Sequence, residues 1–259
     1  MADAPPRPVT VVTGSSRGIG AAIAEALARA GHRLVLTARD GAGLEAVAAR
    51  LRELGTEAIA VAADLRTPGA AESVIARATA EFGAPDVVIS NAGTAPADKI
   101  EKTTDAVLRE TFELHVGAPL AFARAAAPAM KARGSGCLLH LASTAGLRGF
   151  PFTAAYTAAK HGMVGLARAL RAELAPAGIA VYALCPGFVD TAITRQAAAA
   201  VAARGRSTAD EAFARMAAQN RIGRMHTPAE VAAAAAELVA RRPDGCVYDL
   251  DRDVPGFVD

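Results

Sequence analysis

Three side chains with complementary chemistry lie close together in the middle of the 259-residue chain: Ser143, Tyr156 and Lys160. Tyr156 and Lys160 are four residues apart, so on a helix they share one face. A cation at that distance is expected to lower the pKa of the phenol, which lets it give or take a proton near neutral pH. A serine hydroxyl nearby can hydrogen-bond the reacting oxygen atom. The pattern therefore predicts proton transfer to or from an oxygen atom, with Tyr156 as the acid or base.

The elements around these residues are expected to place them at one edge of a sheet. Residues 137–142 form an apolar run that predicts a short buried strand, and Ser143 follows at its carboxyl end. Gly146 and Pro151 then indicate a turn, and 153–175 has the pattern of a helix. Because open α/β sheets bind ligands at the carboxyl ends of their strands, the three side chains are expected at a ligand site.

The N-terminal part of the chain has a pattern of strand, glycine loop and helix. The β-branched run 9–13 predicts a strand, residues 14–20 read GSSRGIG, and an alanine-rich helical pattern covers 21–30. Glycines let backbone N–H groups approach a phosphate closely, and a helix N-terminus adds partial positive charge. The loop alone leaves two interpretations open, because glycine also closes tight turns that bind no nucleotide.

The same alternation continues along the chain. Apolar strand patterns occupy 33–37, 57–61, 86–89, 179–185 and 246–250, and helical patterns occupy 41–54, 67–82, 103–132 and the stretch from Thr227. Alternation of this kind predicts a parallel sheet with right-handed crossovers. The predicted fold class is a single α/β domain over 9–250, a Rossmann-type doubly wound parallel sheet of about seven strands with helices on both faces. The proline-containing residues 1–8 and the irregular 251–259 are expected to be tails.

The motifs and their spacing resemble the short-chain dehydrogenase/reductase family over 9–250. The shared features are Gly14-x-x-x-Gly18-x-Gly20, Asn91-Ala92-Gly93, Ser143 with Tyr156 and Lys160, and Pro186-Gly187. The resemblance implies interconversion of a ketone and a secondary alcohol by hydride transfer from a nicotinamide cofactor. It is strongest toward reductases of 3-oxoacyl thioesters and polyketides and toward 3-hydroxyacyl-CoA dehydrogenases.

The resemblance also implies a role for each residue at a matching position. Ser143 would hydrogen-bond the substrate oxygen, Tyr156 would transfer the proton, and Lys160 would lower the Tyr156 pKa and hold the nicotinamide ribose. The residues implied in cofactor binding are Gly14, Ser16, Arg17, Gly18, Ile19, Gly20, Arg39, Asp64, Leu65, Asn91, Ala92, Gly93, Tyr156, Lys160, Pro186, Gly187, Val189 and Thr191. No metal ligand is implied.

Two arginines bear on the choice between NADP and NAD. The second strand ends in Thr37-Ala38-Arg39, without the acidic residue that would hold a ribose 2′-hydroxyl. Arg39 together with Arg17 can instead pair with a 2′-phosphate. Each arginine alone could equally be a solvated surface residue. The pair favours NADP, with NAD possible.

Two further motifs have a structural interpretation beside the functional one. Asp64 with Leu65 resembles the adenine-contacting position of the family, but Asp64 could equally cap a helix that begins near Thr67. Asn91 is implied to support the sheet as much as to contact the cofactor.

His115 departs from the family pattern. It stands where most members carry an asparagine that anchors a water behind the catalytic lysine. An imidazole that titrates near neutral pH could take part in a proton relay, so His115 is a fourth catalytic candidate. The alternative is a buried histidine that only satisfies a backbone carbonyl.

The region at about 190–225 is expected to be a substrate lid, as the family resemblance implies. Its arginines include Arg195, Arg204, Arg206 and Arg215. Together with alanine- and leucine-rich walls they would suit a bulky substrate with an acidic handle, such as a 3-oxoacyl or 3-hydroxyacyl thioester. Surface arginines also occur without any such role.

Composition excludes several other classes of function. The net charge of +2 arises from 28 basic and 26 acidic residues without a basic run, so no nucleic-acid partner is expected. No apolar stretch is long enough to span a bilayer, and the start has no signal-peptide pattern, so we expect a cytoplasmic protein and no membrane partner. Cys137, Cys185 and Cys246 are interpreted as reduced core residues.

Two functional hypotheses follow. The first is a reductase or dehydrogenase with NADP and a small carbonyl or alcohol substrate, expected to form a homodimer or homotetramer. Its substrate could be a thioester, a polyketide or a simple ketone. The second is a non-catalytic NADP-binding subunit. The departures from the family pattern at His115 and at the C-terminus would favour this hypothesis.

Overall fold

The computed structural model of the chain describes residues 7–203, 205 and 207–259. In this part of the chain the strands are β1 (Val9–Thr13), β2 (Arg33–Ala38), β3 (Ala58–Ala62), β4 (Val87–Ser90), β5 (Gly136–Leu141), β6 (Ile179–Cys185), β7 (Val247–Asp249) and β8 (Gly256–Phe257). The longer helices are α1 (Gly18–Arg29), α2 (Gly41–Glu53), α3 (Ala70–Phe82), α4 (Asp105–Phe112), α5 (Ala118–Arg133), α6 (Ala154–Leu174), α7 (Ala192–Ala203), α8 (Ala209–Ala217) and α9 (Pro228–Arg241).

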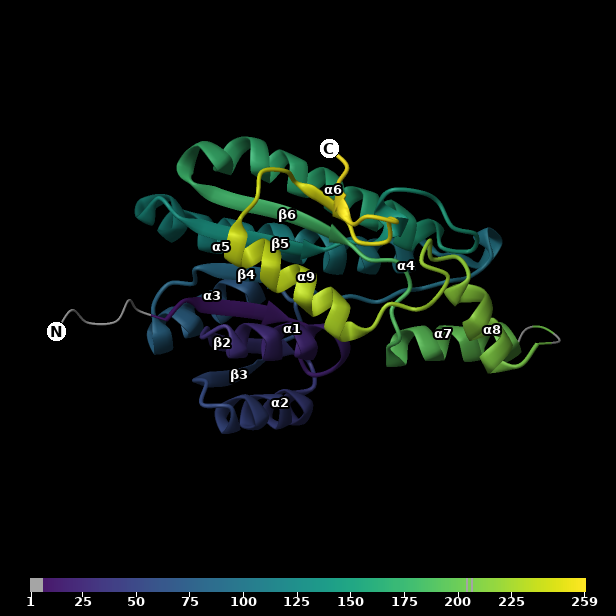
Figure 1. Ribbon diagram of the computed structural model, residues 1–259, viewed down its shortest axis with the longest axis horizontal. Coiled ribbons are helices and arrows are strands. Elements are labelled where there is room, and N and C mark those ends of the chain that lie inside the picture. Colours follow the sequence, from purple (N-terminus) through teal and green to yellow (C-terminus); the bar gives the residue numbers. More distant parts are fainter. Residues whose placement is uncertain (1–6, 204, 206) are drawn as a thin grey trace.

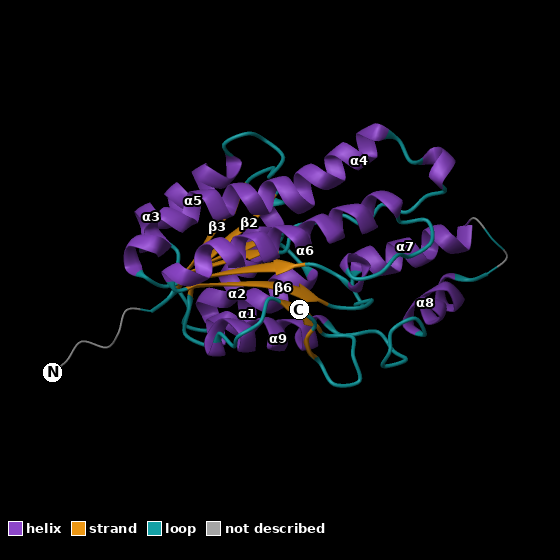
Figure 2. Cartoon of the chain, turned by 90° about the horizontal axis from the view of Figure 1, so that it is seen from above, coloured by secondary structure: helices purple, strands orange, loops and turns teal. Residues whose placement is uncertain are grey.

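The strands form one sheet in the order β3-β2-β1-β4-β5-β6-β7-β8, and all neighbours are parallel except β7 and β8. Successive side chains of a strand face opposite sides of the sheet. Leu34 and Leu36 of β2 therefore pack against α1, α2 and α9, whereas Val35 packs on the side of α3, α5 and α6. Figure 2 shows the two helix layers with the sheet between them. The predicted doubly wound fold is confirmed.

The two helical stretches around the site begin and end at recognisable signals. Thr227 accepts a hydrogen bond from Glu230 N, and the Glu230 carboxylate accepts one from Thr227 N, so α9 starts with a capping box and Pro228. The predicted helix over 103–132 breaks between α4 and α5 at a π-helical turn, Glu113–Gly117. Such turns widen a helix locally and are frequent at functional sites, and this one carries His115.

Both predicted tails differ from the structure where it describes them. Arg33 N donates to Pro8 O at 2.8 Å, and Arg7 Nε donates to Gly31 O at 2.9 Å, so the fold already includes Arg7 and Pro8. Residues 1–6 of that tail lie outside the described residues. At the other end the chain turns back and adds β8 to the sheet, which therefore has eight strands. The Asp259 carboxylate secures this return by accepting from Val247 N at 2.9 Å and also from Cys246 N.

The region expected to be a lid contains the helices α7 and α8 and lies beyond the carboxyl edge of the sheet. Figure 1 shows α7 and α8 side by side at that end. α8 starts with a second capping box, between Thr208 and Glu211. Cys137, Cys185 and Cys246 are buried free thiols. Among the described residues, no helix combines the length and apolar character needed to cross a membrane.

Candidate active site

Most of the site residues expected from the sequence lie in segments that follow the carboxyl ends of strands, whereas His115, Tyr156 and Lys160 lie on helical turns that come after β4 and β5. The glycine loop follows β1, Arg39 follows β2, and Asp64 follows β3. The remaining three connections carry Asn91 after β4, Ser143 after β5, and the segment 186–191 after β6. Because these strands are parallel neighbours, the sheet alone brings six separate parts of the chain to one edge.

Ser143, Tyr156 and Lys160 are brought together at the end of β5. Ser143 has an extended backbone and begins a short 3₁₀ turn, with its Oγ accepting from Ala145 N at 3.1 Å. The first two turns of α6 carry Tyr156, which hydrogen-bonds Ser143, and Lys160, whose Nζ lies 5.7 Å from the centre of the Tyr156 ring. Pro186 O accepts from Thr144 N at 2.9 Å, which ties the segment after β6 to the same turn.

The expected lowering of the Tyr156 pKa by Lys160 is wrong for this structure. Burial raises the pKa of Tyr156, and the hydrogen bond with Ser143 only partly opposes this rise. Lys160 is itself buried, which disfavours its ammonium form and lowers its pKa to about 7. Its Nζ donates to Leu141 O at 2.5 Å. Tyr156 is therefore held as a neutral phenol, beside an amine that changes protonation state near neutral pH.

The glycine loop has no room for a side chain at Gly14 or Gly20. A Cβ at Gly14, where φ is +65°, would lie 2.7 Å from Ala92 Cα, and a Cβ at Gly20 would lie 2.4 Å from Gly14 O. Asn91 Nδ2 donates to Thr13 O at 2.9 Å and to Gly14 O at 3.1 Å, which joins β4 to the loop. The supporting role expected for Asn91 is therefore seen directly.

The loop leads into a helix N-terminus that has room for an anion. No side chain caps α1 at Arg17 among the described residues, so the first N–H groups of the helix have no capping partner there. Ser16 lies beside the start of α2, its Cβ 3.2 Å from the Cβ position of Gly43. Arg17 and Arg39 are both exposed at the ends of the neighbouring strands β1 and β2. The backbone cradle and the two cations fit a phosphorylated nucleotide.

Asp64 has a partner that the sequence analysis missed. Arg66 donates to the Asp64 carboxylate through its backbone N, Nε and Nη2, at 3.1, 3.1 and 2.7 Å. These bonds lower the pKa of Asp64 to about 2. The alternative role as a helix cap is wrong, because α3 begins after Gly69. Leu65 is half-buried against the core.

His115 is buried and uncharged, and it contacts two parts of the site, the backbone of Thr94 and the ring of Tyr156. Its Nε2 lies 2.8 Å from Thr94 O and 3.2 Å from Thr94 N, and its ring meets the Tyr156 ring edge-on with centres 5.6 Å apart. A Cβ at Gly93 would lie 2.5 Å from His115 Cε1. Burial, with a smaller effect of the Lys160 charge, lowers the pKa of His115 to about 3.

This placement corrects the idea that His115 titrates near neutral pH. An imidazole with a pKa near 3 is uncharged at pH 7, so it cannot relay a proton by becoming an imidazolium there. The observed contact with Thr94 agrees with the alternative of a histidine that satisfies a backbone carbonyl. The imidazole also contacts Tyr156 and closes the space next to Gly93, which neither interpretation included.

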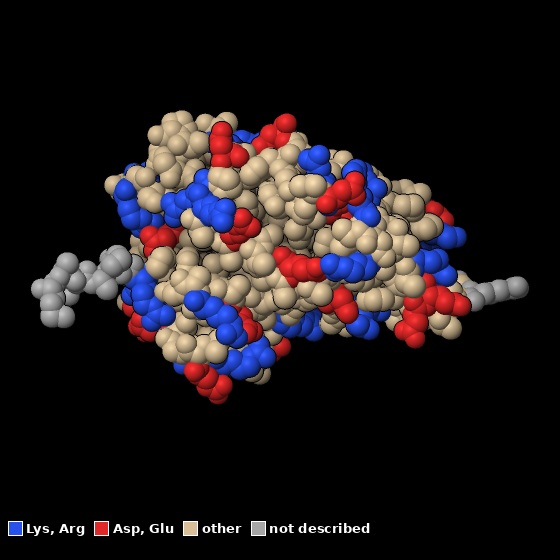
Figure 3. Space-filling model, viewed as in Figure 1, with Lys and Arg blue, Asp and Glu red and all other residues tan. Residues whose placement is uncertain are grey.

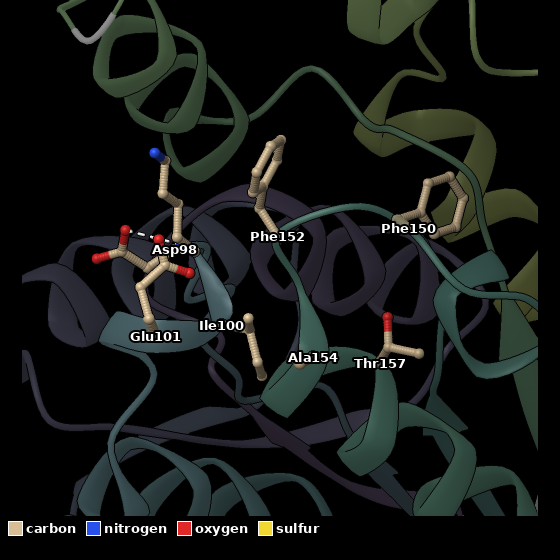
Figure 4. A pocket seen from close by; sticks show the side chains of 8 residues that line it. Asp98, Ile100, Glu101, Phe150, Phe152, Ala154 and Thr157 are labelled. Atoms are coloured by element: carbon tan, nitrogen blue, oxygen red, sulfur yellow. Dashed lines mark hydrogen bonds between the residues drawn. The ribbon is translucent and has the colours of Figure 1, made fainter.

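A pocket of about 410 Å³ opens next to the start of α6. It is lined by Asp98, Lys99, Ile100, Glu101, Phe150, Phe152, Ala154 and Thr157. Figure 4 shows Ile100 and Phe152 near the start of α6, with Asp98 and Glu101 at one end and Phe150 at the other. Ile100 and Phe152 are 72% and 63% exposed, which is unusual for such large apolar side chains.

Phe152 also has an unfavourable backbone. Its φ of +66° lies in the left-handed region that non-glycine residues rarely adopt. Asp98 N donates to Phe152 O at 2.8 Å and links the loop after β4 to the loop before α6. The signals that the sequence offers for this pocket are an apolar residue inside the charged stretch 98–102 and two phenylalanines around Pro151.

The lid arginines that the structure describes bind acceptors of the protein itself. Arg195 donates to both oxygens of Asp190 at 2.7 Å, and Arg215 donates to Ser207 Oγ at 2.7 Å. Arg204 and Arg206 lie outside the described residues. On the face seen in Figure 3 the basic and acidic side chains are interspersed. The described arginines therefore lend little support to a handle for an acidic substrate group.

Comparison with known proteins agrees with this arrangement. Residues 8–202 match the family model described as short chain dehydrogenase. The 3-oxoacyl-[acyl-carrier-protein] reductase FabG of Escherichia coli (strain K12) is 31% identical over 232 residues, which cover 90% of this chain and 89% of that protein. A variant of actinorhodin polyketide ketoreductase solved with NADPH has a TM-score of 0.89 and 32% identity, covering 94% of this chain and 95% of the other.

A second solved structure is L-sorbose reductase from Gluconobacter frateurii complexed with NADPH and L-sorbose. It has a TM-score of 0.89 and 30% identity, and the match covers 95% of both chains. The family model spans most of the chain, and the matched structures share its whole fold. The protein therefore belongs to the short-chain dehydrogenase family.

Proposed function

We propose that the protein is an NADP(H)-dependent oxidoreductase that interconverts a ketone and a secondary alcohol on a bulky, largely apolar substrate. The observation that carries this proposal is the convergence of Ser143, Tyr156 and Lys160 at the end of β5, opposite a glycine loop shaped for phosphates. A hydroxyl and a phenol with an amine nearby can hydrogen-bond and protonate one oxygen atom.

The cofactor-binding edge fits NADP(H). Gly14, Gly18 and the N-terminus of α1 would hold the pyrophosphate, because glycines let backbone N–H groups approach a phosphate and no side chain caps the start of the helix. Arg17 and Arg39 would hold a 2′-phosphate with charge-assisted bonds. The segment 186–191 would hold the nicotinamide end, as the family resemblance implies. Family members solved with NADPH support this assignment.

The reduction step needs a hydride, which NADPH supplies when bound. Ser143 donates a hydrogen bond to the carbonyl oxygen of the substrate, and Tyr156 donates its proton to the same atom. The raised pKa of Tyr156 keeps the phenol protonated before the reaction and makes the phenolate a strong base afterwards. Lys160, with a pKa of about 7, can return a proton to that phenolate at neutral pH. In the direction of oxidation the same groups act in reverse.

The pocket beside α6 supports a substrate with an apolar body next to its carbonyl group. Ile100, Phe150 and Phe152 give its wall a mainly apolar surface, and 410 Å³ is within the range of small-molecule sites. A 3-oxoacyl or 3-hydroxyacyl thioester and a polyketide intermediate have such a body; a polyol does not. FabG is named as a reductase of 3-oxoacyl-[acyl-carrier-protein] and the actinorhodin enzyme as a polyketide ketoreductase, which supports the same class.

The test is a panel of carbonyl substrates under both cofactors. We expect NADPH-dependent reduction of 3-oxoacyl thioesters or bulky apolar ketones, with weaker activity on L-sorbose and with NADH. Tight NADPH binding without turnover of any carbonyl or alcohol would favour the alternative of a non-catalytic subunit. Turnover confined to small simple ketones would leave the chemistry intact and contradict the substrate class.

A further inference from the structure

Behind the segment that follows β6 lies a group of buried polar side chains, Asn220, His226 and Asp251, which we call the lid-base cluster. These residues are 4%, 4% and 1% exposed. Asn220 and His226 belong to the chain that leaves the lid between α8 and α9, and Asp251 follows β7. Polar side chains buried to this extent require partners, so their contacts show what the cluster holds in place.

Asn220 binds the backbone of Phe188 much as a neighbouring strand would. Its Oδ1 accepts from Phe188 N at 2.7 Å, and its Nδ2 donates to Phe188 O at 2.8 Å. His226 N donates to the same carbonyl at 2.9 Å, and His226 O accepts from Asp190 N at 2.8 Å. The chain entering the lid and the chain leaving it are therefore joined at Phe188.

Asp251 holds this junction from the side of the C-terminal segment. Arg221 N donates to both carboxylate oxygens at 3.2 Å, and His226 Nε2 lies 3.1 Å from Oδ1. The side chains of His226 and Asp251 are only 5% and 2% exposed, so water competes little for these bonds. Removing one partner of such a buried pair leaves the other without compensation for its lost hydration.

The lid-base cluster packs directly against Gly187. A Cβ at this position would lie 2.4 Å from Asn220 Oδ1 and 2.8 Å from Asp251 Cγ. At the far end of the same segment, the methyl group of Thr191 is 3.8 Å from the Cβ position of Gly18 in the glycine loop. The backbone 187–191 thus lies between the lid-base cluster and the cofactor-binding edge.

We propose that Asn220, His226 and Asp251 are positioning residues for the nicotinamide end of the cofactor and act through the backbone 187–191. The inference rests on the proposed function, in which that backbone holds the nicotinamide. The adenosine end is assigned to other residues, Gly14, Gly18, Arg17 and Arg39, none of which contacts the cluster in the hydrogen bonds of the described chain. Substitutions in the lid-base cluster should therefore weaken binding of the nicotinamide end of the cofactor and leave binding of the adenosine end unchanged.

The experiment compares two ligands that share the adenosine end. Binding of NADPH and of adenosine 2′,5′-bisphosphate, which lacks the nicotinamide, is measured by calorimetry for the wild type, Asp251→Asn and His226→Gln. Asp253→Asn is the matched control, because it makes the same change on an exposed residue of the same segment. We expect both cluster variants to bind NADPH about ten-fold more weakly and the bisphosphate within about two-fold of the wild type.

Steady-state kinetics give a second readout. We expect kcat to fall about 10- to 100-fold in Asp251→Asn, because a misplaced nicotinamide slows hydride transfer. In the double variant Asp251→Asn/His226→Gln, kcat should fall no further than in the worse single variant, because both substitutions break the same side-chain pair. If Asp251→Asn does not fold, His226→Gln carries the test alone, because glutamine keeps an N–H donor at this position.

The possible results separate this inference from the proposed function. Equal losses for NADPH and the bisphosphate, or kinetic constants within two-fold of the wild type at a lowered melting temperature, would show a purely structural cluster and overturn the inference. A wild-type protein that neither binds NADPH nor reduces any carbonyl would instead overturn the proposed function.

Discussion

The cofactor side and the substrate side of the site are built in different ways. On the cofactor side, Gly14 and Gly20 touch other backbone so closely that no side chain fits, and Asn91 bonds two backbone carbonyls. On the substrate side, the surface consists of exposed side chains such as Ile100 and Phe152. A surface made of backbone has nearly the same shape whatever residues surround it, whereas one made of side chains changes with each substitution.

This contrast has a functional meaning. The protein needs the same cofactor in every reaction cycle, and a rigid backbone cradle binds it with little loss of conformational freedom. The pocket around Ile100 and Phe152, proposed here to hold the substrate, is lined by residues outside the strands, so single substitutions can alter it without disturbing the sheet. His115 and Tyr156 lie at the boundary between the cofactor side and the substrate side, and their rings contact each other edge-on. Substitutions on each side should therefore have separable effects.

The largest effect is expected at the boundary, where the chemistry takes place. Tyr156→Phe removes the proton donor and should lower kcat about 1,000-fold or more, because general acid catalysis contributes up to ~10⁴-fold. The Kd for NADPH should stay within about two-fold, since the ring is retained. Stopped-flow turnover and fluorescence titration measure the two quantities.

Tyr248→Phe is the matched control, because it removes a hydroxyl from a half-buried tyrosine of β7. It should turn over like the wild type. Substantial activity in Tyr156→Phe would mean that another group protonates the substrate.

The next largest effect should be confined to the cofactor side. Arg39→Ala removes one charged partner of a 2′-phosphate, and a bond of this kind contributes about 1.5–3 kcal/mol. The ratio of kcat/KM for NADPH to that for NADH should fall about 10- to 100-fold, with the value for NADH nearly unchanged. Arg77→Ala, on the exposed face of α3, serves as control. An unaltered ratio of kcat/KM for NADPH to that for NADH would show that Arg39 is only a solvated surface residue.

A smaller effect should be confined to the substrate side. Phe152→Gly removes the aromatic wall and also relieves the strained φ, which glycine adopts freely. We expect kcat/KM for a bulky apolar carbonyl compound to fall about ten-fold, while KM for NADPH is unchanged. The melting temperature should not fall, because relief of about 1 kcal/mol or more of strain offsets the added flexibility of the unfolded chain.

The same substitution at an ordinary exposed apolar residue tests the strain argument. Leu54→Gly, at the end of α2, replaces a side chain that is 46% exposed and has no positive φ. It should lose stability without any change in substrate preference. Equal losses of stability in Phe152→Gly and Leu54→Gly would contradict the hypothesis that Phe152 serves substrate binding although its strained backbone destabilises the fold.

The last effect concerns stability rather than catalysis and should appear only in acid. The pKa of His115 is about 3 in the folded protein and 6.5 in a model peptide, so the unfolded chain binds more protons between these values. This residue therefore makes the free energy of unfolding rise with pH from about 3 to 6.5 and contributes no slope above that window. His115→Asn should flatten the rise in urea titrations at several pH values.

The exposed His161 of α6 is the control for that measurement, because His161→Asn makes the same change outside the core. Its pH dependence should match the wild type. An inflection near pH 6.5 in kcat/KM that disappears only in His115→Asn would restore His115 as a titrating member of a relay.

Much of the fold and of the cofactor side could be read from the sequence. The order of strands and helices follows from hydrophobic period and from glycine and proline signals, which are local properties. The cofactor side follows for the same reason, because a strand, a glycine loop and a helix are adjacent in sequence as well as in space. Even the break near Gly117 and the start of α9 at Thr227 and Pro228 have local signals.

The tertiary structure alone decided what depends on burial and on contacts between distant segments. The pKa values of Tyr156 and Lys160 shift because the core removes water from both, which outweighs their spacing on the helix. The contact of His115 with Tyr156 and the pocket around Phe152 follow from packing in the same way. So does β8, because its pairing with β7 depends on how the chain turns after Asp251. Spacing along the chain therefore determined which groups meet at the site, and the surrounding core determined their charge and their neighbours.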